Sequence, residues 1–329
     1  MRVAILGAGA IARTMCATIR GMAAQGWPVE LYAVASRDLA RAQAFANEED
    51  VHHAYGSYEA MLADPAVDLV YIATPHSHHA EQMKMCIHAG KAVLCEKAFT
   101  PNLQQAQEVL ALAREKKVYV ADALWPRYMP SRRIIDDLLA SDAIGEPCML
   151  YSNLCYSIEH KPRITDPALA GGALLDVGIY PLNFASMVFG DDIVRINSTV
   201  ELMECGLDRT ETITIKYRGG RMSQLMASTA FNSDRRAVVY GTKGFMIVDN
   251  VNNPHRIEIY DRDERGIPKR IVGVPPQITG YEYEVEACLR DLQEGNLEPR
   301  EMPHEQTLMM LRQMDALRAI WRVKYPFER

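Results

Sequence analysis

The chain has 329 residues and a formal net charge of −6, and 48% of its residues are hydrophobic against 24% charged. One domain usually takes about 100–200 residues, so two domains are expected. The acidic balance and the lack of clustered Lys and Arg argue against nucleic acid as a partner. No apolar run approaches the roughly 20 residues of a membrane span, so no membrane association is expected.

Cysteine usage and the start of the chain indicate a compartment. The seven cysteines are scattered, odd in number and without a C-x-x-C pair, so neither a disulfide framework nor a zinc knuckle is expected. The chain enters an apolar run directly after Met1 and Arg2, without the pattern of a signal peptide. These features predict a cytoplasmic protein with reduced thiols.

Short apolar runs alternate with helical patterns in the first third of the chain. The runs span residues 2–6, 31–35, 69–73, 92–95 and 118–121, and the helical patterns span 39–47, 80–89 and 103–116. Gly90 stands where a glycine follows the end of a helix. This alternation predicts an α/β dinucleotide-binding (Rossmann) domain over residues 1–122, with a parallel sheet covered by helices on both faces.

The pattern changes after about residue 125. Helices are predicted at 131–140, from 171–178 to about 188, at 281–293 and at 304–321; strands are predicted at 148–158, 194–202, 210–217, 222–231, 237–240, 245–249 and 257–260. Glycines at 219–220 and 241–244 supply turns between successive strands. We therefore expect residues 123–329 to form an α+β domain with a large, open, mostly antiparallel sheet.

The first strand leads into the motif G-x-G-x-x-A. Gly7 allows a tight turn, and Gly9 lets the backbone approach a pyrophosphate. The residues Ala10 and Ile11 open the helix, whose N-terminus stabilises the anion, and the small Ala12 lets helix and strand pack closely. A hexapeptide alone is weak support, but its place between a strand and a helix predicts a dinucleotide site.

The second strand ends in Ala35, Ser36 and Arg37, where enzymes that use NAD place an acidic residue for the ribose 2′-hydroxyl. A hydroxyl and a guanidinium suit a 2′-phosphate instead, because Arg carries a permanent charge and a fork of donors. Arg41, one turn later, could assist. Two alternatives stay open: a solvated Arg37, and Asp38 as either a ribose ligand or a residue of the first helical turn. We favour NADP, with NAD as the alternative.

The third strand ends in Thr74, Pro75 and His76, followed by His79. Ligands of open α/β sheets bind outside the carboxyl ends of the strands, so these residues are expected at the cofactor. The histidine spacing does not match a zinc motif, and no metal is expected. His79 is expected to satisfy polar groups of the backbone or the cofactor.

The fourth strand ends in Glu96 and Lys97. A lysine beside an oxidised nicotinamide is a candidate proton donor or acceptor, because burial and the positive ring both favour the neutral amine. An exposed lysine paired with Glu96 is the alternative.

A second candidate group lies in the segment G-G-A-L-L-D-V-G-I-Y at residues 171–180. If this segment is helical, Asp176 and Tyr180 are four residues apart and share a face. Tyr180 could then bind a substrate hydroxyl and assist Lys97, and Asp176 could orient Lys97 or hold a second hydroxyl. A capping aspartate and a core tyrosine are the alternative.

Together these motifs resemble the glucose–fructose oxidoreductase/inositol dehydrogenase/MocA (Gfo/Idh/MocA) family over essentially the whole chain. Segments 123–128 and 302–304 are similar as well, and the branch with dimeric dihydrodiol dehydrogenase and NADP-dependent D-xylose dehydrogenase looks most similar. The resemblance implies Lys97 as the catalytic lysine, Asp176 and Tyr180 in the site, and Arg163 near the cofactor. It also implies a homodimer or higher homo-oligomer through the C-terminal sheet. Trp125 is expected to line the substrate pocket, with a core position as the alternative.

The sequence departs from the family pattern at two positions. Ala98 follows Lys97 where the family has proline, and a cis peptide bond is costly with alanine. Tyr180 stands where many sugar and inositol enzymes carry histidine, which favours the dihydrodiol and xylose branch.

The predicted function is reversible hydride transfer between NADP and a secondary alcohol of a sugar, polyol or diol. Lys97 would move the hydroxyl proton with the help of Tyr180. Three rival functions were weighed: an NAD-dependent inositol or amino-sugar dehydrogenase, a dinucleotide-sensing regulator without turnover, and a scaffold with a vestigial pocket. Retention of Lys97, Asp176 and Tyr180 argues against the regulator, and the intact glycine turn argues against the scaffold.

Overall fold

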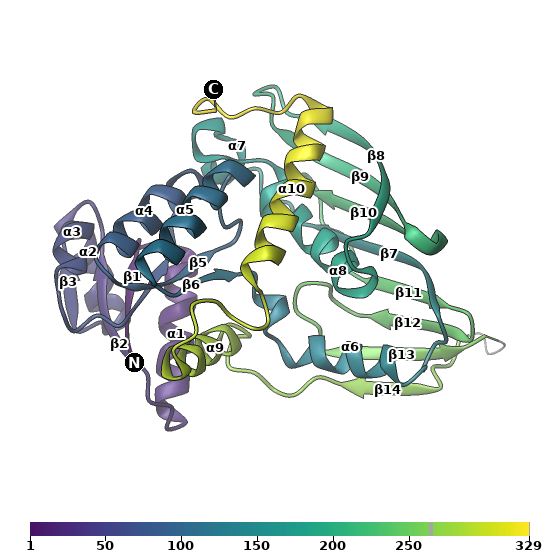
Figure 1. Ribbon diagram of the computed structural model, residues 1–329, viewed down its shortest axis with the longest axis horizontal. Helices are drawn as coiled ribbons and strands as arrows, with labels where there is room; N and C mark the ends of the chain where they lie inside the picture. The colour runs from purple at the N-terminus through teal and green to yellow at the C-terminus, as the bar shows by residue number, and fades with distance from the viewer. Residues whose placement is uncertain (263–265, 329) are drawn as a thin grey trace. The chain divides into compact units, whose positions relative to one another are not determined.

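The computed structural model describes residues 1–262 and 266–328, which form two compact units (Figure 1). The first unit consists of Met1–Tyr128 and Gln277–Leu311, and the second of Met129–Pro276 and Arg312–Arg329. This division differs from the expected boundary between residues 122 and 123. Residues 277–311 return to the first unit because they carry apolar side chains into its core.

The first unit contains a six-stranded parallel sheet of order β3-β2-β1-β4-β5-β6. Its strands are β1 (Arg2–Leu6), β2 (Glu30–Ala35), β3 (His53–Tyr55), β4 (Leu69–Ile72), β5 (Ala92–Glu96) and β6 (Val120–Ala123). This is the strand order of a dinucleotide-binding fold, so the predicted Rossmann domain is confirmed. The short polar strand β3 was not predicted.

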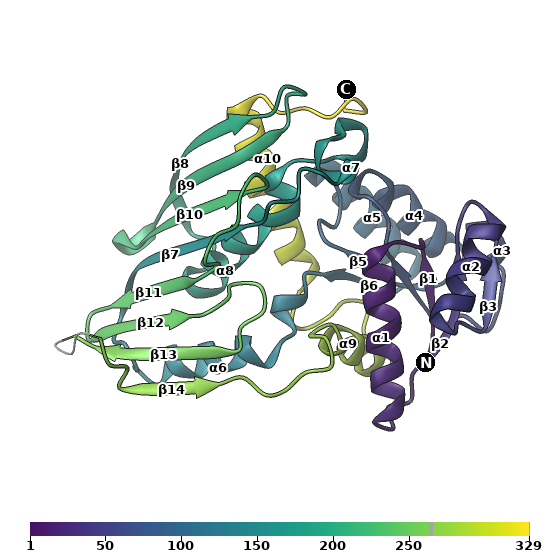
Figure 2. The same ribbon diagram turned by 180° about the vertical axis from the view of Figure 1, so that it is seen from behind.

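Helices cover both faces of this sheet. They are α1 (Ala10–Ala24), α2 (Leu39–Glu49), α3 (Tyr58–Leu62), α4 (His76–His88), α5 (Leu103–Lys116) and α9 (Glu282–Glu294). Figures 1 and 2 show α4 and α5 on one face and α1 and α9 on the other. Helix α4 begins four residues before the predicted start, and Gly90 follows it with φ of 69°, as expected for a helix end.

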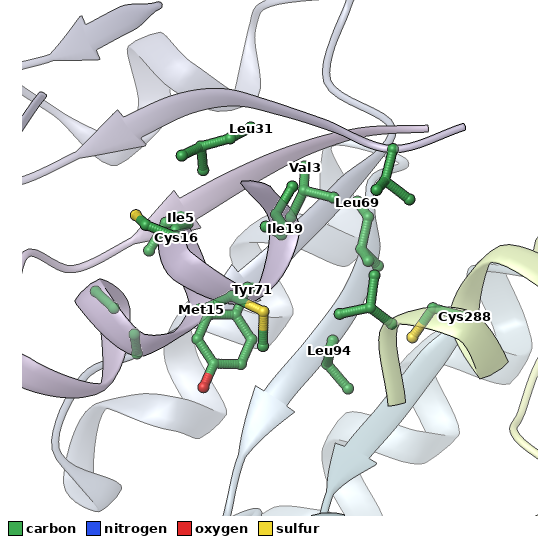
Figure 3. Packing of buried hydrophobic residues seen from close by; sticks show 14 of the residues in the cluster. Val3, Ile5, Met15, Cys16, Ile19, Leu31, Leu69, Tyr71, Leu94 and Cys288 are labelled. Carbon is green, nitrogen blue, oxygen red and sulfur yellow. The ribbon is translucent and has the colours of Figure 1, made fainter. Parts of the chain in front are cut away.

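The core of the first unit is one apolar cluster between the sheet and helices α1 and α9. Val3 and Ile5 of β1, Leu94 of β5 and Cys288 of α9 belong to it (Figure 3). Each of these side chains is at most 1% exposed. The full burial of β1 and β5 explains why both strands are continuous apolar runs without alternation.

The second unit contains an eight-stranded sheet of order β14-β13-β12-β11-β7-β10-β9-β8. The strands are β7 (Pro147–Cys155), β8 (Ile193–Leu202), β9 (Asp208–Tyr217), β10 (Met222–Ser228), β11 (Ala237–Gly241), β12 (Gly244–Val248), β13 (Arg256–Asp261) and β14 (Arg270–Gly273). The prediction of a large, mostly antiparallel sheet is confirmed. The sheet is mixed, however, because β7 and β10 pair in parallel. Strand β14 was not predicted.

Helices of the second unit are α6 (Pro130–Ala140), α7 (Pro162–Thr165) and α8 (Ile179–Phe189), and α10 (His304–Trp321) begins in the first unit and ends in the second. The residues directly before α8, Leu174–Gly178, form a π-helical turn, in which the amide of Ile179 donates to the carbonyl of Leu174. The predicted helix is therefore present, but its first turn is wider than an α-helical turn.

One helical stretch, Pro167–Phe189, has the length and composition of a membrane span. The sequence-based expectation that no such stretch exists was therefore too strict. Because 89% of the most apolar window of this stretch is buried within the protein, it is weak support for a membrane span. The cytoplasmic location stays a prediction.

Candidate active site

The candidate residues of the first unit follow neighbouring strands that end at the same level. Leu6 at the end of β1 pairs with Ile72 of β4, and Ile72 pairs with Cys95 of β5. The glycine motif, residues 73–79 and the Glu96–Lys97 pair therefore leave the sheet side by side at its carboxyl edge. This is the edge at which open α/β sheets bind ligands.

The first turn of the site admits only glycine at position 7. Gly7 has φ of 110°, and a Cβ atom there would lie 2.8 Å from the carbonyl oxygen of Ala73. Gly9 precedes the 15-residue helix α1, whose first turn carries no acidic residue. Exposed helix amides without a competing carboxylate fit a pyrophosphate, as a dinucleotide requires. Ala12 is fully buried, which allows the close packing expected of it; Ala10 is exposed and Ile11 half-buried.

The end of β2 presents two arginines to this turn. Ser36 is buried and donates its backbone amide to the Tyr55 carbonyl, whereas Arg37 is exposed. The Arg41 guanidinium donates to the carbonyl of Ala8 within the glycine motif, at 3.1 Å.

Two further observations place Arg37 and Asp38. Burial lowers the pKa of His78, and the positive charge of Arg37 lowers it further, so Arg37 lies near helix α4. The Asp38 carboxylate accepts the amides of Ala40 and Arg41, at 2.8 and 3.4 Å, and thereby caps α2. Of the two interpretations of Asp38, the one as a helix-start residue matches this geometry.

His79 connects the loops that follow β4 and β5. Its Nε2 lies 2.8 Å from the carbonyl oxygen of Thr74, and its Nδ1 lies 2.8 Å from the carbonyl oxygen of Ala98. Burial lowers the pKa of His79, although these carbonyl groups oppose the shift. A neutral imidazole donates to only one carbonyl, so one contact lacks a proton unless the ring is charged. His79 thus fixes the chain next to Lys97.

Thr74, Pro75 and His76 connect β4 to helix α4, and their expected contact with the cofactor stays a prediction. Thr74 donates its hydroxyl to the Gln82 side chain, at 2.5 Å. Pro75 directly precedes α4, and His76 is the first residue of that helix and is buried. The rings of His76 and His79 meet edge to face, with centroids 5.8 Å apart.

Lys97 is half-buried, and its main chain is held on both sides. The Glu96 carboxylate accepts the Lys97 amide at 3.1 Å and also accepts the Tyr71 hydroxyl. The peptide bond between Lys97 and Ala98 is cis, the geometry for which alanine had appeared unsuited. The backbone at Lys97 is therefore anchored to the sheet by Glu96 and to β4 by His79.

Two buried carboxyl groups lie near Glu96, and the sequence analysis did not find them. Asp122 on β6 accepts the Thr307 hydroxyl at 3.1 Å, and its other oxygen has no hydrogen-bond partner among the described residues. Glu284 on α9 is fully buried, and neither of its oxygens has a partner in the described chain. Burial raises the pKa of Glu284, and the charges of Glu96 and Asp122 raise it further. Glu284 could have been found from the sequence, because it is a glutamate among the apolar residues that form one face of α9.

Trp125 lies in a short 3-10 turn after β6 and is 6% exposed. Its ring stacks on that of Tyr281 with centroids 4.5 Å apart and planes inclined by 6°. This stacking fixes the orientation of Trp125 at the carboxyl edge of the sheet, and it is compatible with both the pocket and the core interpretation.

Arg163, Asp176 and Tyr180 belong to the second unit. Asp176 is buried in the π-helical turn, and its carboxylate forms an ion pair with the Arg163 guanidinium. Tyr180 is 6% exposed and follows in the first turn of α8. The Arg163 guanidinium therefore compensates the charge of the buried Asp176 carboxylate, which lies four residues before Tyr180.

Among the residues that the structure describes, no group of three or more His, Cys, Asp or Glu side chains is arranged to hold a metal ion.

Comparisons with known proteins identify the family. Residues 1–123 match the oxidoreductase family with an NAD-binding Rossmann fold, and residues 133–247 match the GFO/IDH/MocA C-terminal domain. A trans-1,2-dihydrobenzene-1,2-diol dehydrogenase of Danio rerio is 31% identical over 322 residues, which are 97% of this chain and 96% of the relative. The chain belongs to the Gfo/Idh/MocA family of oxidoreductases.

Other members of the Gfo/Idh/MocA family are similar over most of their length. The dihydrodiol dehydrogenase of Mus musculus is 34% identical over 284 residues, covering 86% of this chain and 82% of the relative. The crystal structure of KijD10, a 3-ketoreductase of Actinomadura kijaniata in complex with NADP and TDP-benzene, is 25% identical with a TM-score of 0.85, covering 97% of each chain. The resemblance inferred from the motifs is confirmed, and the chain is an NAD(P)-binding oxidoreductase.

We predict that Asp122 makes this Gfo/Idh/MocA enzyme less stable as the pH rises. Burial raises the pKa of Asp122 to about 7 in the folded chain. Between its ordinary pKa of about 3.9 and about 7, the folded chain holds a proton that the unfolded chain has lost. The free energy of unfolding should therefore fall with pH in this range and lose this dependence above it.

Urea unfolding at pH 5, 6, 7 and 8 measures this effect. Asp122→Asn should have a smaller pH dependence than the wild type, because the amide does not titrate and still accepts the Thr307 hydroxyl. Asp137→Asn, at an exposed position of α6, is the matched control. Parallel curves for the wild type and Asp122→Asn would contradict the assignment.

Proposed function

We propose that this chain is an NADP-dependent oxidoreductase that acts on a secondary alcohol, or the corresponding carbonyl, of a sugar, polyol or trans-dihydrodiol. The observation that carries the proposal is the alignment of the glycine turn, the His79 loop and Lys97 at one edge of the parallel sheet. This edge offers an anion-binding helix N-terminus and an amine at neighbouring strand ends.

The preference for NADP rests on the end of β2. Arg37 and Arg41 follow this strand, and Arg41 already contacts the glycine motif. The acidic residue that would serve an NAD ribose, Asp38, is used as a helix cap. Two permanent cations and an occupied carboxylate favour a 2′-phosphate over a 2′-hydroxyl. The solved structure of the related KijD10 also contains NADP.

The substrate class rests on the relatives and on the second unit. The curated relatives are named as dehydrogenases of a trans-dihydrodiol, and KijD10 as a 3-ketoreductase. Tyr180 offers a phenol and Asp176 a carboxylate, both of which suit neighbouring hydroxyl groups. The ion pair with Arg163 compensates the charge of Asp176, so Asp176 and Tyr180 suit a neutral polyol better than a cationic substrate.

The protein residues supply positioning and proton transfer. The nicotinamide, when bound, supplies the hydride chemistry. Lys97 takes up the hydroxyl proton as the carbonyl forms and returns it in the reverse direction, and Tyr180 donates a hydrogen bond to the same oxygen. Glu96 accepts the backbone amide of Lys97, and His79 contacts the carbonyl of the next residue, Ala98, so both act on Lys97 as positioning residues.

Replacement of Lys97 by methionine tests the catalytic assignment. The change keeps the length of the side chain and removes the amine, so turnover should fall by about 10²–10⁴-fold, while NADPH binding changes little. Absorbance of the reduced nicotinamide measures turnover with trans-1,2-dihydrobenzene-1,2-diol and D-xylose as probes. Lys116→Met on the exposed side of α5 is the control. A Lys97→Met protein with wild-type turnover would remove the assignment.

Replacement of Arg37 by alanine tests the cofactor preference. Loss of one charge-assisted contact to a 2′-phosphate should weaken NADPH binding by about tenfold or more and leave NADH binding unchanged. Quenching of tryptophan fluorescence by each nucleotide gives both dissociation constants. Arg114→Ala, an exposed arginine of α5, serves as the control. An equal loss for NADPH and NADH would show that Arg37 does not recognise the 2′-phosphate.

We also propose that the open face of the eight-stranded sheet binds a second copy of the chain. Helix α8 packs on one face of this sheet, and the opposite face carries no helix of the described residues (Figure 2). Two apolar rows cross this open face. The first row is Tyr151, Val238 and Ile247, and the second is Tyr240, Phe245 and Tyr260. An apolar surface of this kind is typical of a homodimer interface.

Sedimentation velocity tests the dimer with a charge placed in the second row. Tyr240 is 44% exposed and lies beside Phe245, so Tyr240→Asp would place a carboxylate in a dry interface. The wild type should sediment as a dimer and the variant as a monomer. Ile320→Asp, at a 57% exposed position of α10, is the control. A monomeric wild type would exclude the proposed interface.

A further inference from the structure

Two acidic residues of β9, Asp208 and Glu211, are buried beneath the segment that carries Asp176 and Tyr180. Asp208 is fully buried, and Glu211 is 1% exposed. The Asp208 carboxylate accepts the amide of Leu174 at 2.5 Å and also interacts with the amide of Ala173. It therefore binds the first amides of the helical segment, which have no partner within the helix.

Glycines of the same segment make room for both carboxyl groups. A Cβ atom at Gly172 would collide with Asp208, and a Cβ atom at Gly178 would collide with Glu211. Gly172 and Gly178 lie at either end of the π-helical turn. The two acids thus contact the turn at its start and at its end, and the glycines are needed for this close approach.

The two carboxyl groups have each other as partners. The carboxyl groups of Asp208 and Glu211 interact with each other, and in the described part of the chain neither Glu211 oxygen nor Oδ1 of Asp208 accepts a hydrogen bond from any other group. Two buried carboxyl groups that interact with each other resist double ionisation, because like charges repel strongly in a site of low dielectric constant. Asp208 accepts backbone amides, so it is the ionised partner. Glu211 is then the proton donor.

We propose that Asp208 and Glu211 share one proton and that this pair is a positioning device, which holds the π-helical turn bearing Asp176 and leading to Tyr180. Its effect on turnover rests on the proposed function of Tyr180 and Asp176, whereas its effect on the turn does not. The pair binds the backbone of the turn and no reacting group, so both acids act through Asp176 and Tyr180.

The surroundings of the pair contain few other ionisable groups. Cys155 of β7 lies near Glu211, and burial raises the pKa of this thiol. Tyr325, from the C-terminal segment, lies near Asp208 and donates its hydroxyl to the carbonyl of Gly171 at 3.1 Å. Burial raises the pKa of both groups, so they are neutral at physiological pH. Arg318 lies over the Tyr325 ring at 4.6 Å, and its charge is compensated by Asp315 and Glu328.

The pH dependence has a defined sign. Burial raises the pKa of Glu211, and the charge of Asp208 raises it further. Because the pKa of this carboxyl group is higher in the folded chain than in the unfolded chain, its protonation stabilises the folded chain at pH values below the ordinary pKa. This stabilisation is lost as the pH rises from the ordinary pKa toward the folded pKa. The unfolding temperature should therefore decline on the alkaline side, with a contribution that depends on Glu211.

Two variants separate the proton from the shape of the side chain. Glu211→Gln keeps a donor toward Asp208 but does not titrate, and Glu211→Met keeps the length and removes the donor. Glu201→Gln, an exposed carboxylate at the edge of the same sheet, is the control. For each protein we would measure the unfolding temperature from pH 5 to pH 9, the infrared band of a protonated carboxylic acid at pH 8, and turnover with trans-1,2-dihydrobenzene-1,2-diol.

The expected result is that Glu211→Gln retains the fold, has a weaker infrared band than the wild type because the Glu211 component is lost while that of Glu284 remains, and has a weaker alkaline decline of the unfolding temperature. Turnover should stay near that of the wild type in Glu211→Gln and fall by about tenfold or more in Glu211→Met, with NADPH binding unchanged, because only the turn has moved. Glu201→Gln should behave as the wild type in each measurement.

An infrared band of unchanged intensity and an unchanged alkaline decline in Glu211→Gln would overturn the shared proton. Equal turnover of Glu211→Met and the wild type would overturn the positioning role. The infrared and unfolding measurements need no substrate, so they stand even if the probe is not turned over. A failure of the proposed function would instead appear as full turnover in Lys97→Met.

Discussion

The parallel register of β1, β4 and β5 is the constraint on which the candidate site depends. Because the three strands end at the same level, their following loops leave the sheet together. The approach of Gly7 to the Ala73 carbonyl fixes the first loop against the second, and His79 fixes the second against the third. A side chain at position 7 would separate β1 from β4 at the point where a pyrophosphate must lie. Cofactor binding and the pose of Lys97 are therefore consequences of one packing arrangement.

Buried ionisable groups are concentrated behind the candidate residues of both units. In the first unit, Glu96 accepts the Lys97 amide, and Asp122 and Glu284 lie near it without full hydrogen bonding. In the second unit, Asp208 and Glu211 lie behind the turn of Asp176. Such groups reduce stability unless they are protonated or paired. Two of these groups hold backbone segments in fixed positions: Glu96 accepts the amide of Lys97, and Asp208 accepts the amide of Leu174, before Asp176.

Local sequence patterns predicted the elements whose burial is visible as a run or a period of apolar residues along the chain. The run at 2–6 coincides with β1, and the glycine motif lies at the expected turn, because a fully buried parallel strand leaves a continuous apolar signal. Pairings between distant segments left no such signal. The parallel pairing of β7 with β10, and the return of residues 277–311 to the first unit, depend on contacts that periodicity does not encode. The polar β3 is too short to show any period.

The same limit explains which site residues were missed. Gly7, Lys97 and Tyr180 belong to motifs whose chemistry is visible in the sequence, and the structure places the first two at the carboxyl edge of the parallel sheet. Asp208 and Glu211 stand on a strand where acidic residues usually face solvent, so their burial has no sequence signal. Gly172 and Gly178 were interpreted only as part of a helical motif. Their role becomes clear from what a side chain there would strike.

The pairing of Asp176 with Arg163 restricts how the second unit can assist catalysis. A free buried carboxylate beside Tyr180 would hold the phenol proton and oppose its transfer. With the Arg163 guanidinium bound to it, Asp176 carries a compensated charge, and Tyr180 can donate toward a substrate oxygen without leaving two anions together. In the proposed function, proton uptake then falls to the neutral amine of Lys97, because a tyrosine base would have to be a buried anion before the reaction. The pairing of Asp176 therefore favours Lys97 as the proposed base and Tyr180 as the proposed hydrogen-bond donor over the reverse.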